Sequence, residues 1–417
     1  MKMSAPKLRF KDHSAKWNEV ILNDFFYFID GDRGKNYPNE NDFFPEGYCL
    51  FLNAYNISDT GLTFKNTNWL TKEKHKSLRK GTAEYRDLIL TTRGSKLGKL
   101  AVYDESIPYN VVRINSAMLL IRQKQDIDLE YTLYLFKDAI LPKFINQHIV
   151  GSAQPHLTVK DLKAYSTYIP EDVIEQQKIG YFFSLLNLKI QKQQEKVELL
   201  KEQKKGLMQK IFSQELRFKA EGGREFPKWE KKQLNQLLFE NKLRNINGEF
   251  TKEGVLSVSG THGVINQIEF QGRSFAGESV ANYHVVNTGD IVYTKSPLKY
   301  NPYGIIKVNK GKPGIVSTLY AVYSCNQEVS GEYLDFYFQL NDTTNRYLKP
   351  LVNKGAKNDM KVNNQQVLVG IVNIPIFNEQ KKIVEFLLKF DTKIVAEKLR
   401  LNDLNEQKKG FMQKMFV

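Results

Sequence analysis

Cysteine is almost absent from this 417-residue sequence: Cys49 and Cys325 stand far apart, and neither has a cysteine close by. This spacing argues against a disulfide framework and against thiolate zinc sites of the CxxC type. The sequence also lacks any apolar run of about eighteen residues, and its start, MKMSAPKLRFKD, has neither an apolar segment nor a cleavage site. We therefore expect a cytoplasmic protein with no membrane partner.

Acidic residues are in deficit. Asp and Glu number 46 against 61 Lys and Arg, which leaves a net charge of +15. An excess of this size predicts a polyanionic partner such as nucleic acid, although a highly soluble surface is the competing explanation. With 41% hydrophobic residues, a chain of this length has enough apolar material for two or more cores.

An internal repeat is the most informative feature of the sequence. EQKKGLMQKIF at 202–212 returns as EQKKGFMQKMF at 406–416, and a displacement of 204 residues aligns the flanking segments with 17 identities in 38 positions. Weaker matches precede this segment in both halves, namely LRFK at Leu8 and Leu216, Trp17 and Trp229, and RDLILTTRG at Arg86 with GDIVYTKSP at Gly289. The repeat predicts four parts: domains at 1–170 and 213–374, and helices at 171–212 and 375–417.

Both repeated segments show the periodicity of a coiled coil, because their apolar residues recur in alternating steps of four and three. An antiparallel pair in which facing positions sum to 601 sets Gln193 opposite Lys408 and Lys204 opposite Glu397. These polar pairs would fix the register. We therefore expect an α+β fold: two globular α/β domains in a pseudo-twofold arrangement, separated by two long helices that form an antiparallel coiled coil of roughly 60 Å.

Two diverged domains, each followed by a helix that ends on EQKKG(L/F)MQK(I/M)F, resemble the specificity (S) subunit of a type I restriction-modification enzyme. The resemblance covers the whole chain. It implies a noncatalytic subunit whose two target recognition domains each read one half of a split sequence in double-stranded DNA. It also implies that the helices set the spacer between the half-sites and dock two modification (methyltransferase) subunits, which act with restriction/translocase subunits. S-adenosylmethionine, ATP and Mg would then belong to the partner subunits, and no cofactor to this chain.

Two equivalent loops offer candidate DNA contacts. TTRGSKLGK, between two apolar runs of the first domain, predicts a loop between strands in which Arg93, Lys96 and Lys99 reach phosphates. In the second domain, TKSPLKYNPYG supplies Lys295, Ser296, Lys299 and Tyr303 at the corresponding place. The alternative is a pair of turns whose lysines are simply solvated.

Three further stretches carry side chains that can read base edges. GSAQPH contains Ser152, Gln154 and His156, and GAKNDM, at the equivalent place, contains Lys357 and Asn358. GTHGVINQ adds His262 and Asn266. Divergence of ordinary surface loops explains these differences almost as well.

Enzymatic motifs are incomplete. Asn301-Pro302-Tyr303 lacks the second proline of an NPPY tetrapeptide, and GSKLGK at Gly94 is one residue short of a phosphate loop. The histidines do not have metal-ligand spacing. Because acidic residues are nevertheless numerous, a self-contained methyltransferase or nuclease stays open as an alternative function, and so does a scaffold with two protein-binding heads.

Overall fold

The computed structural model describes residues 5–58, 61–148, 156–352 and 362–417. The chain divides into two compact units, the first made of Met1–Gln194 with Leu399–Val417 and the second of Glu195–Lys398. The repeated segments are long helices, α6 (Val173–Phe212) and α10 (Phe377–Met415). Each unit therefore contains one globular domain, the beginning of the helix that follows it, and the end of the other helix.

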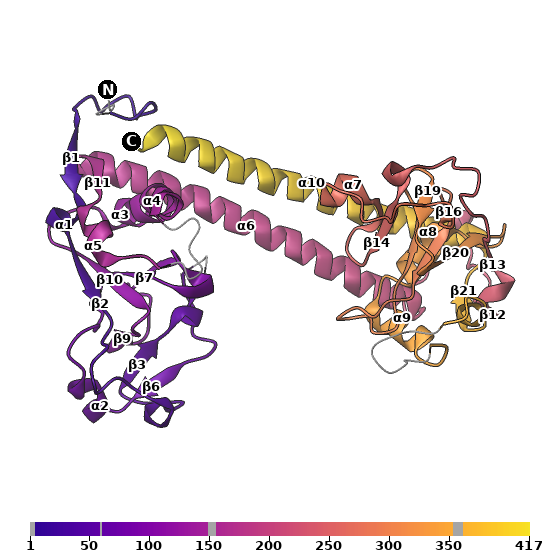
Figure 1. Cartoon of the computed structure of the whole chain (residues 1–417), viewed down its shortest axis with the longest axis horizontal. Coiled ribbons are helices and arrows are strands. Elements are labelled where there is room, and N and C mark those ends of the chain that lie inside the picture. Colours follow the sequence, from indigo (N-terminus) through magenta and orange to yellow (C-terminus); the bar gives the residue numbers. More distant parts are fainter. Residues whose placement is uncertain (1–4, 59–60, 149–155, 353–361) are drawn as a thin grey trace. The chain divides into compact units, whose positions relative to one another are not determined.

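A four-stranded antiparallel sheet forms the centre of the first unit (Figure 1). Its order is β2 (Phe26–Asp30), β10 (Met118–Gln123), β7 (Leu88–Thr91) and β8 (Leu100–Val102). Both faces are covered, so the strands are almost entirely apolar. Leu88 and Leu90 point into the core that includes α6 and the end of α10, whereas Ile89 points into a second core on the opposite face.

Smaller elements complete the first unit. β1 (Trp17–Ile21) pairs with β11 (Ser166–Pro170), β3 (Cys49–Leu52) lies between β6 (Asn68–Leu70) and β9 (Val112–Ile114), and β4 (Ile57–Ser58) pairs with β5 (Gly61–Leu62). The short helices are α1 (Leu22–Phe25), α2 (Lys72–Ser77), α3 (Leu129–Tyr134), α4 (Leu141–His148) and α5 (Val159–Ala164). A π-helical turn at Leu135–Ile140 joins α3 to α4 without a break.

The second unit repeats this central sheet. Its order is β13 (Leu238–Glu240), β20 (Tyr320–Cys325), β17 (Ile291–Thr294) and β18 (Ile306–Val308), and β12 (Glu230–Gln233) pairs with β21 (Ile371–Ile374) as β1 does with β11. The remaining strands pair as β14 (Leu256–Ser259) with β15 (Gly263–Asn266) and β16 (His284–Val286) with β19 (Gly314–Val316). The shared strand order confirms that the duplication extends through the domains.

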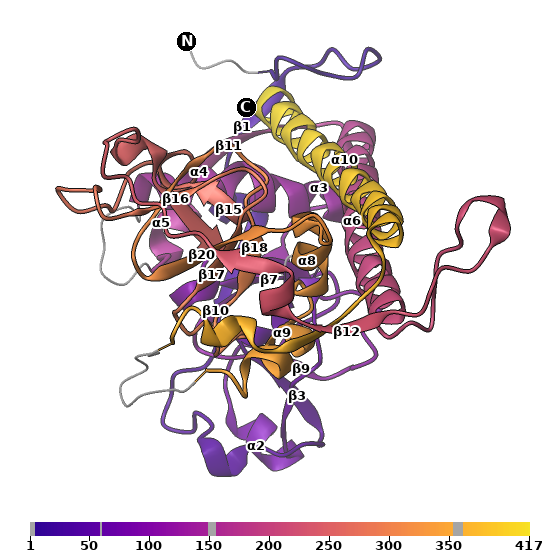
Figure 2. The ribbon, with the colours of Figure 1, turned by 90° about the vertical axis from the view of Figure 1, so that its right-hand side faces the viewer.

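Helices cover one face of the second sheet. α8 (Gly331–Tyr337) lies between the sheet and the two long helices (Figure 2), and the ring of Phe212 in α6 meets the ring of Tyr333 edge-on at 5.8 Å. α9 (Asn341–Leu348) follows after a break at 338–340, while α7 (Gln267–Gln271) lies after β15. The interruption between α8 and α9 has no counterpart in the first unit, where the helix is continuous.

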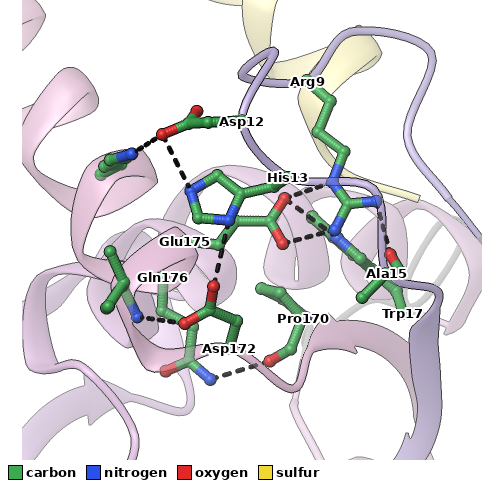
Figure 3. A network of polar contacts seen from close by, with 11 residues as sticks. Arg9, Asp12, His13, Ala15, Trp17, Pro170, Asp172, Glu175 and Gln176 are labelled. Carbon is green, nitrogen blue, oxygen red and sulfur yellow. Dashed lines mark hydrogen bonds and ion pairs between the residues drawn. The ribbon is translucent and has the colours of Figure 1, made fainter.

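A buried carboxylate fastens the first domain to its helix (Figure 3). Glu175, which has no exposed surface, accepts two hydrogen bonds from the Arg9 guanidinium at 2.5 and 2.7 Å and one from the Trp17 indole at 3.3 Å. Beside it, the Gln176 amide donates to Pro170 O at 2.9 Å and accepts from the Asp128 amide at 2.9 Å. We call the Arg9–Trp17–Glu175 cluster the first anchor.

The second unit contains the same arrangement. Glu379, also without exposed surface, accepts from Arg217 at 3.2 and 2.7 Å and from the Trp229 indole at 3.2 Å. Gln380 donates to Pro375 O and accepts from the Ser330 amide, both at 2.9 Å. We call Arg217–Trp229–Glu379 the second anchor. The LRFK and tryptophan matches in the sequence are thus the binding partners of the Glu-Gln pair that begins each repeat.

The other end of each repeat closes a core. Met208 and Ile211, from the first copy of EQKKG(L/F)MQK(I/M)F, are buried in the core of the second unit. Their counterparts Met412 and Met415 are buried in the core of the first unit. Each copy therefore completes the unit built around the other domain. Sequence reasoning did not predict this exchange.

The predicted helix register was wrong. Lys204 forms an ion pair with Asp391 at 2.7 Å in place of Glu397, and Glu397 pairs with Lys196 at 2.9 Å. Lys408 pairs with Asp138 of the first domain at 2.8 Å in place of Gln193. In each unit the facing positions sum to about 594 rather than 601, a displacement of one heptad. The antiparallel direction itself is confirmed.

Candidate nucleic-acid interface

Two predicted contact residues of the first unit, Arg93 and His156, meet just after the end of β7. Thr92 donates its amide to Ala117 O at 2.9 Å, and its own carbonyl accepts from the Leu157 amide at 3.0 Å. Arg93 and His156 form an isolated antiparallel bridge. Arg93 and His156 are 63 residues apart in the sequence, so TTRGSKLGK and the end of GSAQPH are brought side by side by the fold.

Arg93 has hydrogen-bonding capacity to spare. Its side chain is half-buried, and its Nη2 donates to Ser116 O at 3.5 Å, a long contact that Arg33 shares by donating to the same oxygen at 3.2 Å. Among the described residues, buried Arg93 Nε has no acceptor. An unsatisfied buried donor costs on the order of 1–3 kcal/mol.

The predicted loop between two strands is confirmed, since it joins β7 to β8. Hydrogen bonds within the loop fix its conformation. Thr91 Oγ1 donates to Lys96 O and accepts from the Lys99 amide at 3.0 Å. Gly98 has a φ of +79°, and a Cβ there would lie 2.7 Å from Ile145 Cδ1, so the turn requires glycine. Lys96 and Lys99 are half-buried.

Lys295 occupies the equivalent edge of the second unit. It follows β17 directly, and its amide donates to Leu319 O at 3.3 Å, as the Thr92 amide does to Ala117. Burial lowers the pKa of its ammonium group, and the charge of Glu240 opposes that shift. Each central sheet therefore places a half-buried cation at the same strand end.

Residues that the sequence did not single out surround Lys295. Glu240, at the end of β13, accepts from Asn364 Nδ2 at 2.6 Å and from Gln365 Nε2 at 2.7 Å. Buried His284 has a pKa lowered to about 4, first by burial and then by the nearby charges of Arg244 and Lys295. The signal that could have found Glu240 is the position of ENKLRN after β13, which corresponds to that of DGDRGK after β2.

Ser296 and Lys299 are exposed, and the Lys299 ammonium lies 5.3 Å from the centre of the Tyr300 ring. Tyr303, in contrast, is half-buried against the second core, and its carbonyl accepts from the Tyr293 hydroxyl at 2.8 Å. Its position suits packing better than DNA contact.

The GTHGVINQ stretch forms the β14–β15 turn and the start of α7. Asn266 caps α7: its Oδ1 accepts from the amides of Ile268 and Glu269, and its Nδ2 donates to Glu253 O at 2.6 Å. This amide is committed within the chain and is not available to a base. His262 is exposed, with its ring 4.8 Å from that of Phe270.

The remaining predicted contacts, Ser152, Gln154, Lys357 and Asn358, lie outside the described residues. Within the described part of the chain there is no group of three or more His, Cys, Asp or Glu side chains placed to hold a metal ion. In that same part, every helix is too short or too polar to cross a membrane.

Comparison with known proteins agrees with the resemblance drawn from the twin helices. Residues 15–201 match the family described as type I restriction modification DNA specificity domain. The chain is 24% identical over 410 residues to the type I restriction enzyme MjaVIII specificity subunit of Methanocaldococcus jannaschii, covering 95% of this chain and 91% of that protein. A putative MjaX specificity subunit of the same organism is 23% identical over 376 residues, covering 85% and 83%.

Solved structures share the fold. The S subunit of the type I restriction-modification system from M. genitalium superposes with a TM-score of 0.54 at 14% identity over 99% of each chain. A chain from work on complex assembly and conformational transition of the type I R-M system gives 0.56 at 14% identity, over 96% and 97%. Together these findings show that the chain shares the fold of type I restriction-modification S subunits and is similar over most of its length to two specificity subunits, with residues 15–201 matching the DNA specificity domain of that family.

Proposed function

We propose that this chain reads a bipartite DNA target, one half-site with each unit, at the edges where β7 and β17 end. One observation carries the proposal: two sheets of the same topology present Arg93 and Lys295 at the same strand end, each half-buried and surrounded by different polar side chains. A common scaffold with different neighbours suits two readers of different sequences.

Methyl transfer and cleavage would then be carried out by two modification subunits and by restriction/translocase subunits, which would bring S-adenosylmethionine, ATP and Mg. The repeat supports docking of two equal partners. Its exposed side chains are identical in both copies, whereas buried Ile211 corresponds to Met415. The identical exposed pairs are Glu202 and Glu406, Gln203 and Gln407, Lys205 and Lys409, Gln209 and Gln413, and Lys210 and Lys414. We assign three of these pairs to partner docking: Glu202 and Glu406, Gln203 and Gln407, and Lys210 and Lys414.

We also propose that helix length sets the spacer between the half-sites. α6 and α10 have nearly equal lengths, 40 and 39 residues. Insertion of one helical turn, about four residues, in both helices should lengthen the unread spacer by about two base pairs, since a turn rises about 5.4 Å and a base-pair step about 3.4 Å. An unchanged spacer would contradict this role.

The decisive experiment maps methylated sites genome-wide in cells with the modification subunit, with and without this chain. A bipartite motif that appears only with the chain supports the proposal. Methylation without it, or S-adenosylmethionine binding by the purified chain, would favour a self-contained enzyme.

Once the target is known, Arg93→Gln tests the proposed edge. It should weaken binding to the full target about tenfold and reduce the salt slope by about 0.9, the value for one neutralised phosphate. A duplex whose first half-site is scrambled should show little further weakening. Lys295→Gln should behave in the same way toward the second half-site.

A further inference from the structure

A cationic cavity of about 740 Å³ lies within the second unit, between the last turns of α6, the middle of α10 and the start of α9. Its charged lining residues come from three helices and carry an excess of three positive charges. They are Lys201, Lys204, Lys205, Arg346 and Lys398, against Asp342 and Asp391. A cavity with this charge attracts an anion.

Three of these cations are not neutralised by the protein. Lys204, which is 6% exposed, is held by Asp391 at 2.7 Å and by Gln339 Oε1 at 3.2 Å. Lys205, Arg346 and Lys398, by contrast, form no ion pair within the part of the chain that the structure describes. Asp391 therefore offsets the charge of buried Lys204, and the positive charge open to a ligand comes mainly from the three exposed cations.

The start of α9 adds a second source of positive potential. Its N-cap residue, Leu340, has an extended backbone with a φ of −77° and a ψ of 117°, and its side chain provides no capping hydrogen bond. The cavity is lined by the first residues of this helix, Asn341, Asp342 and Thr343, whose amides lack the carbonyl acceptors of a preceding turn. In the first unit, the π-helical turn runs straight into α4, so the described chain has no helix start at the corresponding place.

We propose that this cavity binds a phosphate group, and that the group is a backbone phosphate of the DNA spacer beside the second half-site. The inference rests on the proposed function, which sets α6 and α10 along the spacer. A phosphodiester matches the unpaired ammonium and guanidinium groups and the amides at the start of α9, and the interaction would be independent of base sequence.

Arg346→Gln and Lys398→Gln test the proposal, because both side chains are exposed, so that their replacement leaves the core intact, and neither belongs to the repeated pairs assigned to docking. The assembled methyltransferase should bind its target five- to tenfold more weakly with either variant. The slope of log affinity against log salt should fall by about 0.9 in each, the value for one neutralised phosphate. Target and non-target duplexes should be affected equally. Lys393→Gln, an exposed lysine of α10 outside the cavity, is the matched control and should change neither quantity.

Neutral methylphosphonates, placed singly along the spacer, identify the source of the phosphate. One or two positions should weaken wild-type binding and have no further effect in Arg346→Gln. If the variants instead bind DNA normally but lose binding of ATP, the phosphate belongs to a free nucleotide and the DNA assignment is wrong. Normal affinity, salt slope and nucleotide binding in both variants would overturn the site altogether. Failure of the wild-type complex to recognise any bipartite target would instead contradict the proposed function.

Discussion

The two units are alike in the contacts that hold each domain to the long helices, and they differ in the elements that surround the central sheet. Both contain a buried glutamate bound by an arginine and a tryptophan, and both close their core with the same repeated segment. They differ in the strands beside the central sheet, and in the helix after β10 or β20, which is continuous in one unit and broken in the other. Duplication has thus preserved the attachment of the domains, while the surfaces assigned to reading have diverged.

The anchors provide the largest expected effect. Arg9→Met leaves the Glu175 carboxylate buried without its ion-pair partner, which should destabilise the first unit by about 3 kcal/mol. Arg217→Met should do the same to the second unit through Glu379. Hydrogen exchange of the amides of β10 and β20 measures the stability of the first and the second unit separately. Arg33→Met, at an exposed arginine, is the control. Equal loss of protection in both units from either substitution would refute the idea of two independent anchors.

Because each repeat is buried in the core of the other domain's unit, a substitution in a repeat should destabilise that other unit. Ile211 follows the first domain in sequence but is fully buried in the second unit, so Ile211→Ala should destabilise the second unit by about 3 kcal/mol. Met415→Ala should cost the first unit about 2 kcal/mol, because methionine leaves a more adaptable site. The same exchange measurement applies. Destabilisation of the first unit by Ile211→Ala would contradict the exchange of helix ends.

Acid should destabilise the second unit through His284, which is buried there. Its folded pKa of about 4 lies below the usual value of 6.5, so the unfolded state binds a proton more readily. The second unit therefore loses stability as the pH falls from about 6.5 to 4, on the order of 1–2 kcal/mol by pH 5. His284→Gln should remove this dependence. Urea denaturation at pH 7 and pH 5, followed by hydrogen exchange, measures it; an unchanged pH dependence in the variant would exclude His284 as its source.

The sequence predicted the features that depend on residues close together in the chain. Heptad spacing identified α6 and α10, and the apolar runs around TTRGSKLGK identified β7 and β8. The register was missed because polar residues on the seam do not decide it alone. Lys204 and Lys408 each contact a globular domain, through Gln339 and Asp138, and these contacts depend on tertiary structure that spacing does not encode.

Only part of the candidate interface was predicted, because the rest of it also depends on tertiary structure. Arg93 and Lys295 were found because they follow recognisable strands. Glu240 and His284 were missed because strands distant in sequence bring them to Lys295. Asn266 was assigned to base contact because its amide can bind a base, yet the α7 cap uses that amide first. A residue type shows which hydrogen bonds a side chain can form, but it does not show whether those groups are already used within the protein.

Two glycines give the smallest effect on stability and the sharpest test of docking. Gly206 and Gly410 stand at the same place in both repeats, inside helices where glycine costs roughly 0.5–1 kcal/mol relative to alanine. A Cβ built at either position meets nothing within 4 Å, whereas at Gly180 it would lie 2.6 Å from the Tyr131 amide nitrogen. Packing within the chain therefore explains why position 180 is glycine, but it does not explain why Gly206 and Gly410 are glycine.

If a partner approaches the repeat closely, Gly206→Ala and Gly410→Ala should each raise stability by about 0.5–1 kcal/mol and yet weaken binding of the modification subunit. Gly180→Ala should lower stability, because its methyl group collides with the backbone. Titration of the chain with modification subunit, followed by analytical ultracentrifugation, counts the partners bound. Each single variant should impair one of the two binding events and the double variant both. Full occupancy in the double variant would mean that docking does not use this face, even though the helices had become more stable.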